Sequence, residues 1–365
     1  MQKKLIALAV AGALVAPAAA MADAEIYGKL RMSVDFNDNG DTTDGNDDSA
    51  LALTSHASRI GFKGSEELSG GLKAIWQLES EMEIDDGDDL TSKQRNTYVG
   101  LAGDFGQVRA GRHDTPYKLM GKHIDIFVDT GADYNAVIQF DTRAPNAIAY
   151  ISPDMSGFTF AGAYVTAHNA SDLGGGGFTS TDDLPRLEEE GEMDAISLMA
   201  QYKMAGLYLG IAYESLNGIV PPDSGDDLDD ATSLKLAASY ELAEATQFGL
   251  IYQTNEAGDA EQDNIYFSVA HKMGDTTLKF AYGQLGELEG ELEGDDLPGE
   301  DGADFFALGV TQALSKTTEL YALYATMGNE DNGDNGLKKV DYGDGDLGED
   351  VATLSFGLNH KFSSM

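Results

Sequence analysis

The sequence predicts an all-β protein, a transmembrane antiparallel β-barrel of about sixteen strands with one long loop folded into its lumen. Three observations predict this fold. Apolar and polar residues alternate over many short segments, short turns alternate with long polar connections, and one long connection carries apolar residues that need burial. Together they describe strands that are apolar on one face and polar on the other, joined as hairpins.

Residues 1–22 have the pattern of a signal peptide. Two lysines precede an apolar run over residues 5–16, and the small residues 20–22 resemble an A-x-A cleavage site. The apolar run is too short to span a bilayer as a helix, and no other uninterrupted apolar stretch is long enough. We therefore expect an exported mature chain, residues 23–365, without a transmembrane helix.

The composition excludes some classes of protein. The chain has no cysteine, so no disulfide framework holds it. Its formal net charge is −40, and a chain this acidic will not bind nucleic acid non-specifically. The charge is consistent with a field that attracts cations and equally with an acidic surface that keeps the protein soluble in salt. Only the location of the charge can separate these two interpretations.

Period-two alternation is the dominant pattern in the mature chain. In residues 25–36 the even positions are mainly apolar and the odd positions mainly polar, and residues 352–362 repeat this pattern. The same alternation, less regular, predicts the remaining strands at 54–64, 72–84, 95–102, 106–113, 146–152, 158–167, 193–203, 207–216, 231–242, 246–255, 264–273, 276–283, 303–314 and 318–327.

The connections favour a closed barrel over a soluble β-sandwich. Tight turns alternate with long connections, and most acidic residues of the chain lie in or beside the long ones. Long loops at one end and short turns at the other are typical of outer-membrane barrels. About sixteen strands in one continuous meander satisfy the backbone hydrogen bonds of their first and last strands most easily if the sheet closes on itself. Closure leaves no exposed edge. At this strand number the interior is an aqueous channel.

The connection at residues 113–143 differs from all the others. It is far longer than the usual connection of about two to six residues, and it is rich in apolar residues such as Ile124, Phe127 and Ile138. Apolar clusters argue against disorder. We therefore expect this segment to fold into the barrel and narrow it. The alternative is a small subdomain packed on the outside.

The chain resembles the general bacterial porins, trimeric sixteen-stranded outer-membrane channels, over essentially its whole mature length. The segments that carry the resemblance are IYGKLRMSVDF (26–36), SRIGFKGSEELSGGLKAIWQLE (58–79), RNTYVGLAGDFGQVRAGRHDTPYK (95–118), RAPNAIAYISPDMSGFTFAGAY (143–164) and FGLNHKF (356–362). The resemblance implies a location in the outer membrane, contact with its lipid and lipopolysaccharide, a homotrimer, and a third long loop inside the barrel. The family usually ends on an aromatic residue, whereas three residues follow Phe362 here.

The resemblance also implies a basic wall opposite the inward loop. By motif position its residues are Lys29, Arg59, Arg95 and Arg143, and Arg31 shares the polar face of Lys29. The other interpretation is that these are ordinary charges of a wet lumen. The acidic candidates within the loop are chosen by residue type and position only, and they are Asp125, Asp129, Asp133 and Asp141.

The sequence offers no catalytic or cofactor chemistry. The six histidines have no metal-ligand spacing, and no motif supports an enzyme. The Asp-rich runs at 226–230 and 331–350 lack the spacing of a tight calcium loop, so we expect at most loose divalent cation binding there. No cofactor is expected.

The expected function is a passive aqueous channel for small hydrophilic solutes and ions. The acidic mouth outnumbers the few basic residues of the wall, so the sequence predicts cation selectivity. The alternatives are a substrate-specific channel of the same fold and a structural or adhesive outer-membrane surface protein.

Overall fold

The computed structural model describes residues 24–38, 50–85, 93–167, 193–217, 230–258, 260–287, 289, 291–292, 295–296, 302–329 and 351–364. The proposed signal peptide and most of the acidic long connections lie outside these ranges. No helix in the described part of the chain is long and apolar enough to cross a membrane.

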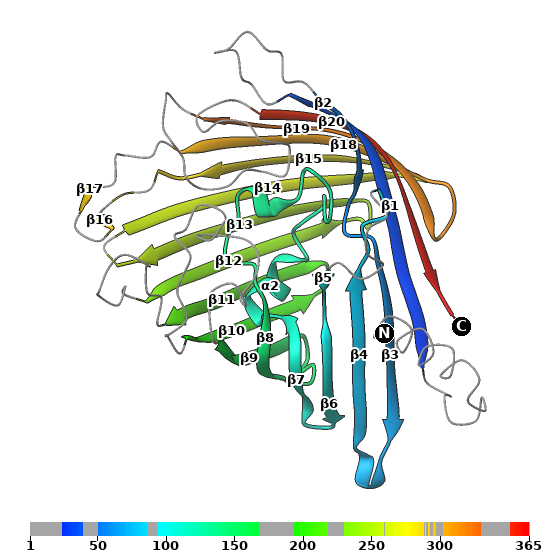
Figure 1. Ribbon diagram of the computed structural model, residues 1–365, viewed down its shortest axis with the longest axis vertical. Coiled ribbons are helices and arrows are strands. Elements are labelled where there is room, and N and C mark those ends of the chain that lie inside the picture. The colour runs from blue at the N-terminus through cyan, green and yellow to red at the C-terminus, as the bar shows by residue number, and fades with distance from the viewer. Residues whose placement is uncertain are drawn as a thin grey trace, which may run out of the picture.

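The chain forms a closed antiparallel barrel (Figure 1). Strands that follow one another in sequence pair around most of the ring, and β15 pairs with β18. β1 closes the ring by pairing with β20, with Tyr27 opposite Ser363 and Asp38 opposite Ala352. The strands are β1 Glu25–Asp38, β2 Ala50–Ser55, β3 Arg59–Glu67, β4 Lys73–Glu81, β5 Lys93–Gln94, β6 Thr97–Gly103, β7 Gly106–Asp114, β8 Arg143–Ile151, β9 Phe158–Ala167, β10 Met193–Met204, β11 Leu207–Asn217, β12 Ala231–Leu242, β13 Thr246–Ala257, β14 Ala260–Met273, β15 Thr276–Leu285, β18 Ala303–Ala313, β19 Thr318–Asn329 and β20 Val351–Ser363. The short pair β16 Glu291–Leu292 and β17 Asp295–Asp296 forms a separate sheet.

The ring has sixteen positions, which confirms the predicted fold. The main sheet contains eighteen strands, but β2 and β3 both pair with β1, and β5 and β6 both pair with β4. Each of these two pairs occupies one position, so eighteen strands fill sixteen positions.

The break between β2 and β3 is a bulge opposite Arg31. Ala57 has a φ of 47°, and the Ser58 hydroxyl accepts a hydrogen bond from the Arg31 N–H at 2.9 Å and donates to the Arg31 carbonyl at 3.0 Å. The Ser58 hydroxyl therefore pairs with Arg31 beside the backbone bond from the His56 N–H to the Arg31 carbonyl at 3.1 Å. An extra residue of this kind re-aims neighbouring side chains, and Arg59 follows directly.

The two faces of each strand divide as the alternation predicts. In β1 the outward Val34 and Phe36 are exposed, whereas Ser33 and Asp35 are buried on the inward face. Large apolar side chains are exposed in this way on strands all around the ring. An outward apolar band with a polar interior is the pattern of a barrel that faces lipid.

The segment between β7 and β8 lies inside the ring (Figure 1). It contains α2, Pro116–Gly121, and the 3₁₀ turn η2, Tyr134–Ala136. Thr115 caps α2 by accepting a hydrogen bond from the Lys118 N–H, and Pro116 occupies the first helical position, where its missing N–H costs nothing. This constriction segment, residues 113–143, contacts the inward faces of β10 to β14.

Glycines on the inward wall provide space for the apolar side chains of the constriction segment. A Cβ added to Gly249 would lie 2.7 Å from Ile124 Cγ2, and one added to Gly283 would lie 2.6 Å from Val137 Cγ2. Gly309 has the same relation to the ring of Phe127 at 2.6 Å, and Gly210 to Met120 Sδ at 2.7 Å. These glycine sockets let the segment approach the wall closely.

The main hydrophobic core therefore lies inside the barrel, between the constriction segment and the wall. Its buried members from the segment include Met120, Ile124, Phe127, Val137, Ile138 and Phe140, together with Tyr117 and Tyr134. The expectation that the apolar residues of the segment need burial holds for the first six of these, and Leu119 and Ile126 are partly buried. Val128 is the exception and is exposed beside the charged residues described next.

Candidate functional site

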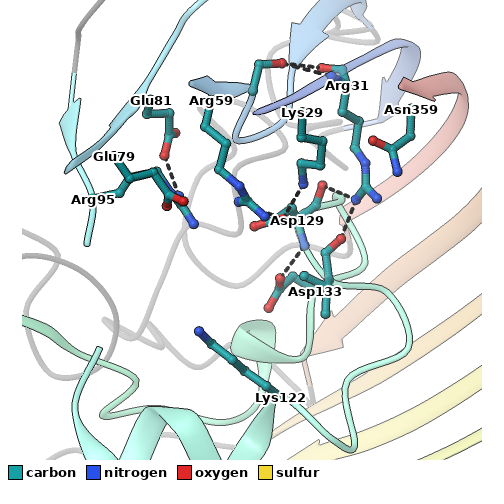
Figure 2. A network of polar contacts seen from close by, with 12 residues as sticks. Lys29, Arg31, Arg59, Glu79, Glu81, Arg95, Lys122, Asp129, Asp133 and Asn359 are labelled. Carbon is teal, nitrogen blue, oxygen red and sulfur yellow. Dashed lines mark hydrogen bonds and ion pairs between the residues drawn. The ribbon is translucent and has the colours of Figure 1, made fainter. Parts of the chain in front are cut away.

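The arginines of the chain are concentrated on one part of the barrel wall. Six of the seven lie on β1, β3, β7 and β8 or, for Arg95, between β5 and β6, whereas the constriction segment packs on β10 to β15 and β18. The narrowed lumen consequently has a basic wall on one side and the constriction segment on the other, as Figure 2 shows.

Asp129 is the carboxylate at which the segment meets the basic wall. Lys29 donates to Asp129 Oδ2, and Arg59 Nη1 lies 3.2 Å from the same oxygen. The backbone N–H of Asp129 donates to Asp133 at 2.8 Å, which holds the turn (Figure 2). Burial alone would raise the pKa of Asp129, but Arg59 and Lys29 hold that pKa well below its usual range. The basic wall therefore favours the ionised form of Asp129.

Arg31 binds the backbone of the segment rather than a carboxylate. Its Nη1 donates to the carbonyl of Val128 and, at 2.8 Å, to that of Asp129. These bonds fix the loop at the residue that carries the central carboxylate. Asp129 has a φ of 53°, a strained value for a residue with a side chain, and the bonds to both carbonyls hold it there.

Arg95 pairs with its own wall. Its Nε lies 2.8 Å from Glu79 Oε1, and its Nη1 lies 2.6 Å from Glu81 Oε2 (Figure 2). Both glutamates are on the inward face of β4, next to the strand position that β5 and β6 share. Two carboxylates therefore neutralise this arginine without help from the constriction segment.

Arg143 pairs with the first residues of the segment. Its Nε lies 2.9 Å from Asp114 Oδ1 and 3.1 Å from Asn96 Oδ1. Lys122, which follows α2, donates to the other oxygen of Asp114. Asp114 is buried and so joins the two ends of the segment to each other and to the wall.

Asp141 does not face the basic wall. It is 2% exposed and accepts a hydrogen bond from Lys235 Nζ at 2.5 Å, and Lys235 is fully buried on β12. Tyr134 donates to the second oxygen of Asp141. Beside this pair, Tyr117 shares hydrogen bonds with Ser233 and with Gln253. We call Asp141, Lys235 and Tyr134 the latch, because they join the segment to the opposite wall.

Asp125 is buried and Asp133 half-buried within the segment itself. Asp125 accepts from the Phe127 N–H at 2.8 Å, and Asp133 accepts from the backbone of Asp129 and Asn135. Burial raises the pKa of Asp125, and the Asp133 carboxyl raises it further. Burial also raises the pKa of Asp133. Of the four acidic candidates, Asp129 alone reaches a basic side chain of the predicted wall.

Four charged residues that pair with the predicted site residues were not predicted from the sequence as parts of this site. Glu79 and Glu81 lie on the polar face of an alternating strand, which is the only signal that could have indicated them. Asp114 and Lys235 give no such signal, because their roles depend on which strands the segment crosses. The structure brings all five predicted basic residues to the wall. Four of them pair with three separate carboxylate clusters, and Arg31 binds the backbone of the segment.

Within the described residues, no group of three or more histidine, aspartate or glutamate side chains could hold a metal ion. The Asp-rich runs for which loose divalent cation binding was expected fall outside those residues, apart from Asp230.

Arg59 gives a direct test of the basic wall. Arg59→Ser is expected to weaken the passage of anions relative to cations, because one positive charge leaves the side of Asp129 while Lys29 continues to hold that carboxylate. Stability should change by no more than about 1 kcal/mol, since Arg59 is partly solvated. Reversal potentials and the heat-dependent mobility on gels would measure the two effects. Lys63→Ser, on the same face of β3 but half-exposed, is the control, and severe misfolding without altered selectivity would mean that Arg59 is structural.

A sixteen-stranded barrel with an outward apolar band and an inward segment that narrows a polar lumen is the architecture of pore-forming outer-membrane proteins. The family profile described as Gram-negative porin matches residues 7–332. The chain belongs to this family, and its location is the outer membrane.

Several known proteins are similar to the chain. Outer membrane porin protein 32 of Delftia acidovorans is 32% identical, and the alignment covers 99% of this chain and all of that protein. Major outer membrane protein P.IB of Neisseria meningitidis is 36% identical over 47% of this chain and 51% of its own length. Among solved structures, the anion-selective porin from Comamonas acidovorans superposes with a TM-score of 0.71 at 23% identity, and the match covers 93% of this chain and 99% of that one.

Proposed function

We propose that the protein is a passive, non-catalytic channel for small hydrophilic solutes and ions that prefers cations and works as a homotrimer. The pairing of the basic wall with carboxylates carries the proposal of cation preference. A wall of unpaired arginines would favour anions at the narrowest point, whereas paired ones leave little net field there.

The charge of the constriction supports this proposal. Six basic side chains approach it, against five carboxylates that pair with or face them, which leaves a net charge of +1. The basic ones are Lys29, Arg31, Arg59, Arg95, Lys122 and Arg143, and the carboxylates are Asp114, Asp129, Glu79, Glu81 and Glu319. Asp125 and Asp133 are left out of this sum because their carboxylates bond to the backbone of the segment itself and pair with none of these side chains.

The whole chain, in contrast, carries −40, and the long connections hold most of its acidic residues. Charge that lines the mouth of a low-dielectric channel raises the local concentration of the opposite ion. At physiological ionic strength that field decays over about 8 Å, whereas at roughly 0.01 M salt it extends over about 30 Å. The preference for cations should therefore be moderate at high salt and stronger at low salt.

Anion preference is the second candidate. The observation that favours it is the concentration of six arginines on one part of the wall, together with the name of the solved structure from Comamonas acidovorans, an anion-selective porin. In that case the constriction would dominate and the acidic connections would affect only the exterior.

Reversal potentials in planar bilayers decide between the two candidates. We expect cation-selective potentials across a potassium chloride gradient, with a larger permeability ratio when the mean concentration is lowered. Anion preference at both concentrations would contradict the proposal. Pure protein that gave no current steps would support a structural or adhesive surface protein instead.

A further inference from the structure

The charged pair of the latch is enclosed by aromatic rings. Asp141 is 2% exposed, and Lys235 is fully buried on β12. The centre of the Tyr117 ring lies 3.9 Å from Lys235 Nζ, and that of the Tyr134 ring lies 5.7 Å from it. Charges in such a site lose most of their hydration. Transfer of a proton from the ammonium to the carboxylate, which leaves an amine and a carboxylic acid, therefore costs much less than in water.

The pair is also placed for a bond between nitrogen and carbon. Lys235 Nζ lies 2.5 Å from Asp141 Oδ1, which brings it close to the roughly 3–3.5 Å from Cγ at which a nucleophile begins its attack. Tyr134 donates to Oδ2, and Lys118 Nζ donates to the backbone carbonyl of Asp141 at 2.6 Å. Two groups held in this way can react as if at roughly 10⁵–10⁸ M, which favours condensation even in water.

A second carboxylate lies beside the pair without a hydrogen bond of its own. Glu214 on β11 is 1% exposed, and neither of its carboxylate oxygens has a hydrogen-bond partner among the described residues. Lys235 pairs with Ala212 in the ladder between β11 and β12, and Glu214 is two residues further along the same inward face. Long side chains reach across such diagonal positions, and Glu214 interacts electrostatically with both Lys235 and Asp141. A buried carboxylate without hydrogen bonds is costly, and it points to a chemical role here.

We propose that Lys235 and Asp141 condense to an amide, which joins the constriction segment covalently to β12. Lys235 passes a proton to Oδ1 of Asp141, and its nitrogen then attacks Cγ. Oδ2, held by the Tyr134 hydroxyl, receives the carbonyl electron pair during the attack and returns it when the Cγ–Oδ1 bond breaks. Glu214 accepts a proton from the nitrogen and delivers it to the departing Oδ1 hydroxyl. One water leaves, and no oxidant, reductant or cofactor takes part.

The bond would hold the segment in the lumen independently of the ion pair. The chain has no cysteine, so a disulfide cannot serve this purpose. The inference goes beyond the proposed channel function and does not depend on the ion that the channel prefers.

Mass spectrometry of the purified mature protein tests the bond. The intact mass should be lower than that of the unreacted chain by the mass of one water. After unfolding, trypsin should not cut at Lys235, because the amide blocks cleavage there, and it should release residues 123–143 joined to residues 204–272. Lys122 and Asp114 form a second lysine–aspartate pair, but the Lys122 side chain is 46% exposed. This pair is the internal control, and trypsin should cut after Lys122.

Variants of Asp141 and Glu214 separate the reaction from folding. Asp141→Asn should still form the amide, with loss of one ammonia in place of one water. Glu214→Gln keeps the size of the side chain, and it should slow the cross-linking at least about 100-fold when the mature chain is refolded in detergent, because a neutral amide cannot carry the proton. Glu214→Asp should restore part of the rate. The heat-dependent gel mobility would show that each variant is folded.

An intact mass without the loss of water, together with normal cleavage after Lys235, would overturn the inference. Equal rates in Glu214→Gln and the unchanged protein would remove Glu214 from the reaction. Current steps from the same preparation in planar bilayers report on the proposed channel function separately, since a channel requires no covalent bond between the segment and β12.

Discussion

Deleting residues 124–134 is expected to raise the single-channel conductance severalfold and to admit larger sugars. These residues include Ile124, Phe127 and Asp129, through which the constriction segment packs on β13 and β18 and reaches the basic wall. Their removal takes away the obstruction while the strands, which pair independently of it, remain closed. Conductance steps and the swelling of liposomes in sugars of increasing size would measure the effect.

A deletion of equal length within the Gly- and Asp-rich connection 168–192 is the matched control. We expect it to change selectivity slightly and to leave the size limit unaltered. The heat-dependent gel mobility of both variants should remain that of a folded barrel. An unchanged size limit in the 124–134 deletion would place the segment outside the conducting path.

Lys235→Met is expected to release the constriction segment from the wall. The latch pair is almost completely buried, so the substitution leaves the Asp141 carboxylate without its counter-charge in a low-dielectric site. Losing one partner of a buried pair costs about 3–5 kcal/mol. This cost exceeds what a surface ion pair contributes, and it falls on the loop rather than on the strand ladder. We expect noisy, enlarged single-channel currents from a barrel that is still folded.

The double variant Lys235→Met with Asp141→Asn tests that explanation. It removes both charges, and Tyr134 can still donate to the remaining side-chain oxygen. Quiet currents of nearly normal size should return. If Lys235→Met alone behaved like the unchanged protein, or if the double variant were as noisy as the single one, the latch would not hold the segment.

The sequence predicts the barrel well because alternation is a local property of each strand. The predicted bounds of β9 and β12 agree with the structure, and those of most other strands differ by a few residues. The breaks at β2/β3 and β5/β6 were not predicted. The first depends on a hydrogen bond between Ser58 and the backbone of Arg31, which are far apart in sequence. The alternation of apolar and polar residues does not predict a contact of this kind.

The charged site was harder to predict, because its pairs join residues that are distant along the chain. The basic residues were found through family motifs, yet their partners depend on the path of the segment across the lumen. Asp129 and Asp141 look alike in the sequence. In the structure one faces the basic wall and the other, twelve residues later, is buried against Lys235 on β12. Twelve residues are enough for the chain to cross the lumen from the basic wall to Lys235. The sequence alone does not show which of the two aspartates faces which wall.

The glycine sockets have a consequence for how such channels can be recombined. Ile124, Val137 and Phe127 each fill the space that a glycine leaves on a wall strand. The fit therefore depends on residues from two distant parts of the chain. The constriction segment is therefore not a transplantable module. Grafted into a relative whose wall has larger residues at these positions, it would stand farther from the strands and occlude the lumen. If the segment were grafted together with its matching glycines, the recipient barrel should acquire the pore width of this protein.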